Sequence, residues 1–174
     1  MLENKSDDEV AQLVPTARFL DGGGMNAGGC SIRGANGGTL RVWGCGYSER
    51  HGNSSNDAWQ PQGEARRKML AQIPPGVDIL ITHGPPSSLP REPFGMKKSA
   101  SGKPMSGCAL LLDEVSKKQP KVHVFGHGHE AHGAHRPDGD GTGTLFVAAT
   151  SVREGTLTAE NPPLVLDVPA AKGP

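Results

Sequence analysis

The sequence predicts an α/β fold built from a mixed β-sheet with flanking helices. Short apolar segments rich in β-branched residues alternate along the chain with two segments of helical periodicity, an order typical of α/β proteins. Turn-forming residues separate these segments, because the 174 residues include 25 glycines and 15 prolines. The length suits one domain with a buried core.

Residues 1–38 are expected to be poorly structured. One short helix is expected within residues 1–20, ended by Pro15. Residues 21–38 (DGGGMNAGGCSIRGANGG) are so rich in glycine that they favour a loop or a weak strand with bulges. The first ten residues, MLENKSDDEV, are polar and acidic, unlike a signal peptide.

The first clear strand and the first long helix follow this segment. TLRVWGCGY (39–47) reads as a strand bounded by glycines. Residues 57–73 predict an amphipathic helix that begins near Pro61. The apolar residues expected on its buried side are Ala65, Met69, Leu70 and Ile73.

Two strands with a helix between them are predicted next. VDILIT (77–82) and KVHVFG (121–126) are rich in β-branched residues and read as strands. Residues 106–118 predict a helix with Ser106 as its N-cap. We expect the two strands to be interior neighbours with this helix crossing between them. The remaining predictions are a long loop over 83–105 and strands over 144–150 and 164–168.

Charge and composition exclude several classes of protein. Lys plus Arg equals Asp plus Glu, 18 each, so no nucleic-acid-binding patch is expected. No apolar run approaches the roughly 20 residues of a membrane span. Cys30, Cys45 and Cys108 are few and far apart, without a CxxC pair, which favours neither a disulfide framework nor a cysteine zinc site. We therefore expect a reduced, cytoplasmic protein.

Three histidines directly follow predicted strands. His83 comes after the strand over 77–82, while His127 and His129 come after the strand over 121–126. Ligand sites in α/β sheets lie beyond the carboxyl ends of strands, and neutral imidazole is the commonest metal ligand. We expect the three imidazoles to converge on a metal site; the alternative is a polar, solvated, His-rich loop.

The other histidines point elsewhere. His123 lies inside a predicted strand and is expected to be partly buried with its hydrogen bonds satisfied. HEAH (129–132) has one residue too few between its histidines for the zincin motif HExxH, which also needs a helix. The histidines expected to face solvent are His51, His132 and His135.

Four segments carry a further signal: DILITHGPP (78–86), GCALLLDEV (107–115), VHVFGHGHEAHG (122–133) and NPPLVLDVP (161–169). Together they resemble the C-terminal half of calcineurin-like metallophosphoesterases, in the branch that contains the metallophosphoesterase-domain proteins. The resemblance implies a β-sandwich with flanking helices and a centre of two divalent metal ions (Mn, Fe or Zn) at the strand ends. It also implies that His83 and His127 bind one metal and His129 the other, whereas Glu130 is not a ligand.

The sequence departs from the family in its first third. Residues 1–60 contain none of the motifs Asp-x-His, Gly-Asp and Gly-Asn-His, whose carboxylates would bridge two cations. We therefore expect residues 39–169 to be the C-terminal part of such a domain, with 170–174 as a tail. At most one metal ion is expected, and no catalytic residue is assigned.

Three functions follow from this interpretation, of which the third is an interaction protein that binds no metal and keeps a residual fold. The first is a metal-dependent phosphoesterase, acting on phosphomonoesters or phosphodiesters, that is weakly active or inactive as this chain alone. The alternative is a non-catalytic remnant that binds a single divalent metal through its histidines. The expected partner is a phosphate-ester small molecule rather than a nucleic acid or a membrane. A homodimer is one way in which the centre could be completed.

Overall fold

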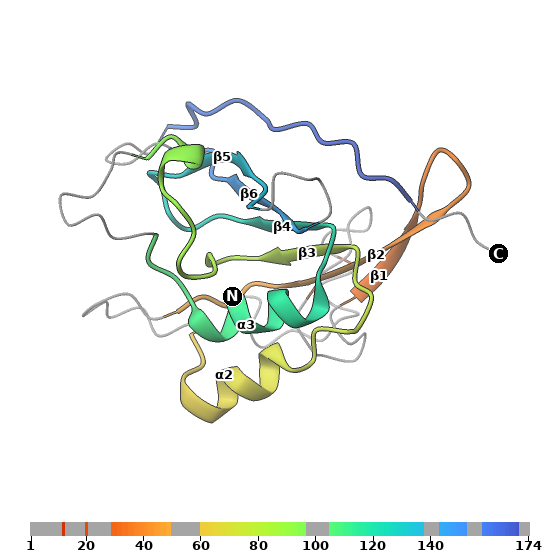
Figure 1. Ribbon diagram of the computed structural model, residues 1–174, viewed down its shortest axis with the longest axis horizontal. Coiled ribbons are helices and arrows are strands. Elements are labelled where there is room, and N and C mark those ends of the chain that lie inside the picture. Colours follow the sequence, from red (N-terminus) through yellow and green to blue (C-terminus); the bar gives the residue numbers. More distant parts are fainter. Residues whose placement is uncertain are drawn as a thin grey trace.

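A computed structural model describes residues 12, 20, 29–49, 60–96, 105–137, 143–152 and 158–170. They form a mixed six-stranded sheet and two α-helices (Figure 1), which confirms the predicted α/β fold. All the described strands belong to one sheet, so the second sheet implied by the resemblance is not among the described residues. The elements are β1 (Gly29–Arg33), β2 (Thr39–Cys45), α2 (Gly63–Leu70), β3 (Ile79–Thr82), the 3-10 helix η1 (Glu92–Phe94), α3 (Ala109–Lys118), β4 (Val122–Phe125), β5 (His132–His135) and β6 (Leu145–Ala149).

The strand order β1-β2-β3-β4-β6-β5 places parallel strands in the middle of the sheet. β2, β3, β4 and β6 are mutually parallel, and β1 and β5 are antiparallel strands at the two edges. β3 pairs with β4 in the register Ile79 to Val122, and α3 lies between them in the chain. The prediction that these strands are neighbours is confirmed, and their carboxyl ends therefore lie at one edge of the sheet.

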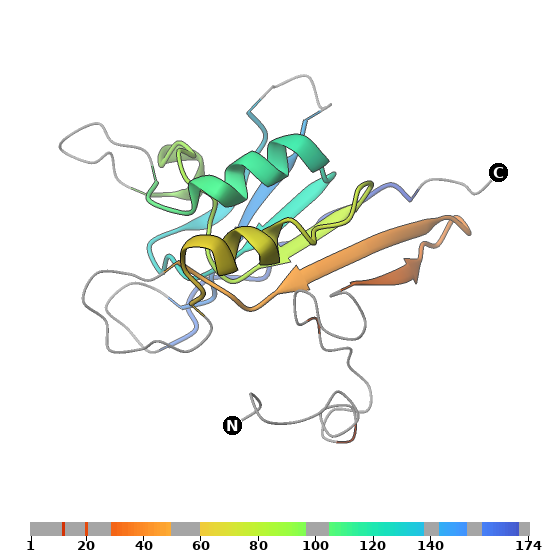
Figure 2. The ribbon, with the colours of Figure 1, turned by 90° about the horizontal axis from the view of Figure 1, so that it is seen from below.

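The hydrophobic core lies between the sheet and the two helices. Figure 2 shows α2 and α3 on the same side of the sheet. Leu80 of β3 is fully buried in this core, whereas its neighbour Ile81 is 39% exposed, because successive strand residues point to opposite faces. The helices contribute Leu70 and Leu111 to the same cluster.

The two helices are shorter than predicted and start later. α2 begins at Gly63, and α3 begins at Ala109 after Cys108, without a side-chain cap, so the prediction of Ser106 as N-cap is wrong. The buried side of α2 also differs from the prediction. Arg66 and Leu70 are buried in it, while Ala65 is exposed.

The described residues of the predicted long loop over 83–105 form several backbone contacts. Met105 donates its backbone N–H to the carbonyl of Leu89 at 2.9 Å, and Pro86 forms an isolated parallel bridge with Cys108. The 3-10 helix η1 carries Phe94, which is fully buried. The described part of this segment therefore packs against the residues that precede α3.

Three stretches near the sheet differ from expectation. β1 forms inside the glycine-rich segment 21–38, so the weak-strand alternative is the one observed, and β5 forms where only loop was expected. The predicted strand over 164–168 is wrong. Its alternate residues are half-buried, and Leu164 and Leu166 lie near Val147, on the sheet face opposite to Leu80. The segment is thus extended against the sheet without pairing to it.

The described residues nearest the carboxyl end contact the sheet and the turn between β1 and β2. Residues 158–170, drawn in blue, run past the strands towards the turn between β1 and β2 (Figure 1), where Asn36 donates to the carbonyl of Ala170 at 3.1 Å. The helix predicted within residues 1–20 lies outside the described residues, except for residues 12 and 20. Within the described residues, no helix is both long and apolar enough to cross a membrane.

Candidate functional site

His83 and His127 meet where β3 and β4 end. Nδ1 of His127 lies 3.1 Å from Nε2 of His83, and the ring centroids are 4.9 Å apart in an edge-to-face arrangement. The two residues are 44 positions apart in the chain. They become neighbours because β3 and β4 are adjacent and parallel, so their exits share one edge of the sheet.

The backbone of His83 is held from both sides. Its N–H donates to the carbonyl of Cys45 at the end of β2, at 3.2 Å. Its carbonyl accepts from the N–H of Gly126, just after β4, at 3.0 Å. These bonds continue the hydrogen-bonding pattern of the sheet one residue beyond β3. They fix the backbone from which the His83 side chain extends.

The loop after β4 carries His127 in an unusual backbone conformation. Its φ is +66°, in the left-handed region that costs a non-glycine residue about 1–3 kcal/mol. Hydrogen bonds on both sides maintain it: Gly128 donates to the carbonyl of Gly126 at 2.8 Å, and Thr150 Oγ1 donates to the carbonyl of Gly128 at 3.1 Å. Strain of this kind persists where the surroundings determine the conformation, and it is commonest at functional sites.

One residue further into the sheet, a buried contact supports the same two strands. Thr82 Oγ1 donates to the carbonyl of Gly84 at 2.8 Å and lies 2.9 Å from Nε2 of His123. Because the hydroxyl proton is already used, Nε2 of His123 donates and Nδ1 carries only a lone pair. Nδ1 has no hydrogen-bond partner among the described residues. His123 is fully buried, so the expectation of partial burial with both nitrogens satisfied is wrong.

The pKa values of these imidazoles keep them neutral. Burial lowers the pKa of His83 below its ordinary value, and the nearby charge of His129 lowers it further. Burial lowers the pKa of His123 to about 3. A neutral imidazole offers a lone pair, which a protonated one lacks, so His83 is in the form that a metal requires.

The structure brings two of the three predicted ligands into contact. His129 is exposed in the loop after β4, close enough to act on the charge of His83. Among the described residues, however, no group of three or more His, Cys, Asp or Glu side chains is arranged to hold a metal ion. Glu130 lies exposed in the same loop. The described site is therefore an imidazole pair with a third imidazole nearby.

Asp78, the one carboxylate on β3's own segment, lies at the opposite end of the strand. It accepts from the backbone N–H of Arg41 at 2.7 Å and pairs with Lys121 at 2.9 Å. Burial alone would raise its pKa, but the Arg41 N–H and the Lys121 ammonium hold the pKa below its ordinary value. Asp78 thus fixes the amino-terminal edge of the sheet and is unavailable to the histidines.

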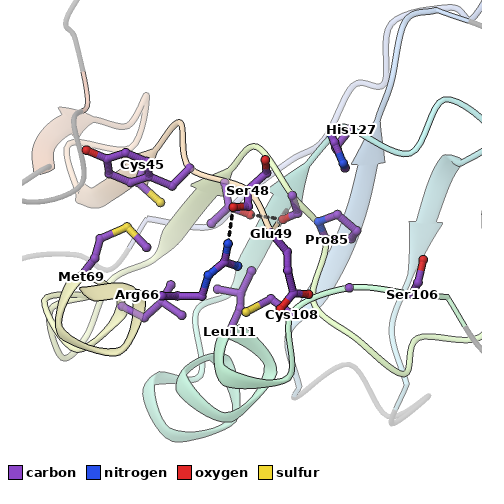
Figure 3. Close-up of a pocket in the computed structure, with 15 residues that line it drawn as sticks. Cys45, Ser48, Glu49, Arg66, Met69, Pro85, Ser106, Cys108, Leu111 and His127 are labelled. Atoms are coloured by element: carbon purple, nitrogen blue, oxygen red, sulfur yellow. Dashed lines mark hydrogen bonds between the residues drawn. The ribbon is translucent and has the colours of Figure 1, made fainter. Parts of the chain in front are cut away.

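A cavity of about 170 Å³ adjoins the imidazole pair. His127 lines it from the loop after β4, and Arg66 lines it from α2, with Ser48 and Glu49 between the sheet and this helix (Figure 3). Sequence reasoning missed Arg66, because arginine is usually exposed. The signal that could have found it is the spacing of Arg66, Leu70 and Ile73, which fall at i, i+4 and i+7 and are all buried.

Cys45, one of the two cysteines that line this cavity, is not an activated nucleophile. Burial raises the pKa of the Cys45 thiol to about 11, while the backbone N–H of Tyr47 and the charge of Arg66 act in the opposite direction and are outweighed. The thiol is therefore protonated at neutral pH and lacks the nucleophilic form. The chemistry of the site rests on imidazole and guanidinium groups instead.

Comparisons with known proteins agree with the predicted resemblance over part of the chain. Metallophosphoesterase domain-containing protein 1 of Homo sapiens is 42% identical over 114 residues, which is 64% of this chain and 31% of that protein. A UPF0046 protein of Caenorhabditis elegans is 31% identical over 135 residues, covering 77% of this chain and 44% of that protein. The chain thus spans less than half the length of these relatives. No family model matches it.

Structural comparison supports the fold alone. One crystal structure superposes with a TM-score of 0.52 over 82% of this chain and 49% of the other chain, at 18% sequence identity. The sequence relationship is more informative than this superposition. Over the matched part of its length, the chain is related to the metallophosphoesterase domain-containing proteins, as its motifs predict.

Proposed function

We propose that this chain binds one divalent cation through His83 and His127 and serves the metal-dependent hydrolysis of a phosphate ester. The observation that carries the proposal is the 3.1 Å separation between Nδ1 of His127 and Nε2 of His83. The similarity to proteins named for a metallophosphoesterase domain supports the reaction class. The proposal concerns this chain alone and not the activity of its longer relatives.

The spacing of the two nitrogens suits a shared cation. Two imidazole nitrogens that bind one tetrahedral metal at about 2.0–2.1 Å lie roughly 3.3 Å apart. The observed 3.1 Å is close to this value. It also suits a hydrogen bond in which one imidazole donates to the other, so a cation would take the place of that single proton.

The described ligand set limits how tightly a cation is held. Two neutral imidazoles neither complete a coordination sphere nor balance the charge of a divalent ion. A bound cation supplies a Lewis acid that stabilises charge on phosphoryl oxygens and lowers the pKa of water. Hydrolysis breaks the ester P–O bond, forms a new P–O bond to the oxygen of water and transfers a proton to the leaving alcohol. We expect this reaction to be slow or absent with the chain alone.

The second candidate function is a non-catalytic module that holds a single divalent metal. It is favoured by the lack of any third ligand in place among the described residues. The two candidates share the imidazole pair and differ only in turnover. One experiment with two measurements therefore separates them.

The test combines metal titration with turnover of a chromogenic phosphodiester. Mn²⁺ is titrated at pH 7.5 into the wild-type chain, His83→Ala and His127→Ala, and hydrolysis is followed with excess Mn²⁺. His135→Ala is the matched control, because His135 pairs with Phe146, near the amino end of β6 and away from the strand exits. We expect one weak site that both substitutions remove and the control retains, with little or no turnover.

Each other outcome has a definite meaning. Mn²⁺ binding that survives both substitutions would contradict the proposed ligands. Robust turnover that His127→Ala abolishes would show that the chain completes its centre by another route, such as a second copy, and light scattering would then reveal the dimer. Binding without turnover would support the non-catalytic module.

A further inference from the structure

Arg66 places a positive charge inside the protein. The side chain is only 6% exposed, and it lines the same cavity as His127. Burying a charged group sacrifices its hydration, so buried arginines normally face a group of opposite charge. The environment of Arg66 therefore calls for an anion.

The described protein groups around Arg66 do not supply that anion. Nε donates to the carbonyl of Pro61 at 2.8 Å, and Nη2 donates to the carbonyl of Ser48. Both acceptors are neutral, and they use two of the five N–H groups of a guanidinium. Among the described residues, Arg66 forms no ion pair; Glu49 lines the same cavity but is exposed to solvent.

One side of the cavity is built from closely packed backbone. Its wall includes Gly107, where an added Cβ would lie only 2.5 Å from the carbonyl oxygen of Pro86 and 2.6 Å from that of Pro85. Backbone therefore packs on backbone at this wall, and Cys108 donates to the Pro85 carbonyl at 3.0 Å. A volume of about 170 Å³ is close to that of cavities known to take up one small ring, about 150 Å³, and it can hold one small group.

Resting on the proposed function, we infer that this cavity binds the phosphoryl group of a phosphate monoester, with Arg66 as the residue that holds its anionic oxygens. The guanidinium donors match the spacing of phosphate oxygens, which makes arginine the side chain of choice for such groups. Because His127 lines the same cavity, a group held there by Arg66 shares the cavity with one member of the imidazole pair. Arg66 is thus assigned as a specificity-determining residue.

Charge decides between a monoester and a diester. A phosphate monoester carries about −1.5 to −2 at neutral pH, whereas a diester carries a single negative charge. The buried Arg66 gains more from the larger charge, because its own charge is compensated only by carbonyl dipoles. The negative charge of Glu49, which lines the same cavity, repels both ligands. Its removal therefore tests the role of charge in the cavity independently of Arg66.

The test measures binding of inorganic phosphate by calorimetry, with EDTA present so that no metal takes part. We expect saturable binding to the wild-type chain at millimolar concentration, with competition by sulfate and none by chloride. Arg66→Met should weaken phosphate at least about tenfold and Arg66→Lys by less, since the lost bonds are charge-assisted. Glu49→Gln should strengthen it severalfold.

The same samples separate this inference from the proposed metal site. Arg66→Met should keep the Mn²⁺ affinity of the wild type, whereas His83→Ala should lose Mn²⁺ and keep phosphate. Phosphate affinity that is equal in wild type and Arg66→Met, or lower in Glu49→Gln, would overturn the inference. If Arg66→Met does not fold, the sign of the Glu49→Gln effect and the sulfate competition on the wild type decide the question.

Discussion

His123 and His127 both reach from β4 and its exit towards the end of β3, yet one is fully buried and the other lies at the surface. His123 contacts Thr82 at 2.9 Å, and His127 contacts His83 at 3.1 Å. The partners are consecutive residues on the β3 side, while the two histidines are four residues apart. Histidine side chains therefore join the same two segments at two points, one buried and one at the surface.

The difference shows that place along the strand decides what each histidine can do. Inside the sheet, burial holds the pKa of His123 near 3 and leaves it neutral as a core residue. Beyond the strand end, burial lowers the pKa of His83 as well, but the ring remains reachable from solvent. The inner contact supports the outer one, and only the outer one is open to a ligand.

Replacement of His123 by alanine is the most damaging test of this comparison. The change removes a buried ring, leaves a cavity and takes away the N–H that donates to the Thr82 hydroxyl oxygen, so we expect a loss of about 3 kcal/mol in the free energy of unfolding. His127→Ala at the exposed position should cost about 1 kcal/mol or less. Urea denaturation of the two variants at pH 7.5 gives the comparison, and equal losses would remove the distinction between inner and outer contacts.

Acid should lower the free energy of unfolding by a smaller amount than the His123→Ala substitution does. The unfolded chain protonates His123 near pH 6.5, whereas the folded chain keeps it neutral down to about pH 3. Stability is therefore lost as the pH falls through this window, by roughly 2 kcal/mol at pH 5.

His123→Gln should remove this part of the pH dependence, as measured by urea denaturation at pH 7.5 and pH 5. A variant whose stability falls as steeply as that of the wild type would show that other groups carry the acid sensitivity.

The smallest expected effect concerns the backbone of His127. Glycine accepts a φ of +66° without strain, so His127→Gly should be about 1 kcal/mol more stable than His127→Ala. Both variants should lose Mn²⁺ binding equally, because both lack the imidazole. Thermal unfolding of the pair gives the difference. Identical midpoints would mean that the loop relaxes and that the strain is absent in solution.

The central elements could be predicted because their signals are local. The β-branched residues of VDILIT and the apolar run before Gly126 identify β3 and β4, and the helix between them follows from its periodicity. Their order along the chain then places His83 and His127 at one edge of the sheet. The contact between the two imidazoles was therefore accessible from the sequence.

The remainder depends on contacts with other segments of the chain. β1 has little intrinsic strand character and forms because Ile32 and its neighbours pair with β2. The burial of Arg66 depends on the carbonyl of Ser48, which only the folded chain brings close. The segment 164–168 has the alternation of a strand but does not pair with the sheet. The residue pattern of a single segment does not report such pairing.

The 44-residue separation of the imidazole pair also bears on how the chain folds. Closing a loop of this length costs roughly 3 kcal/mol in entropy, which must be spent before β3 and β4 can gain from their contacts. A cation that binds only the closed form stabilises it by RT ln(1 + L/Kd), where L is the concentration of the free cation. If the two strands are already paired in the folding transition state, Mn²⁺ will accelerate folding; if they pair later, it will slow unfolding alone. The effect of Mn²⁺ on the folding and unfolding rates therefore reports whether β3 and β4 pair before or after the transition state.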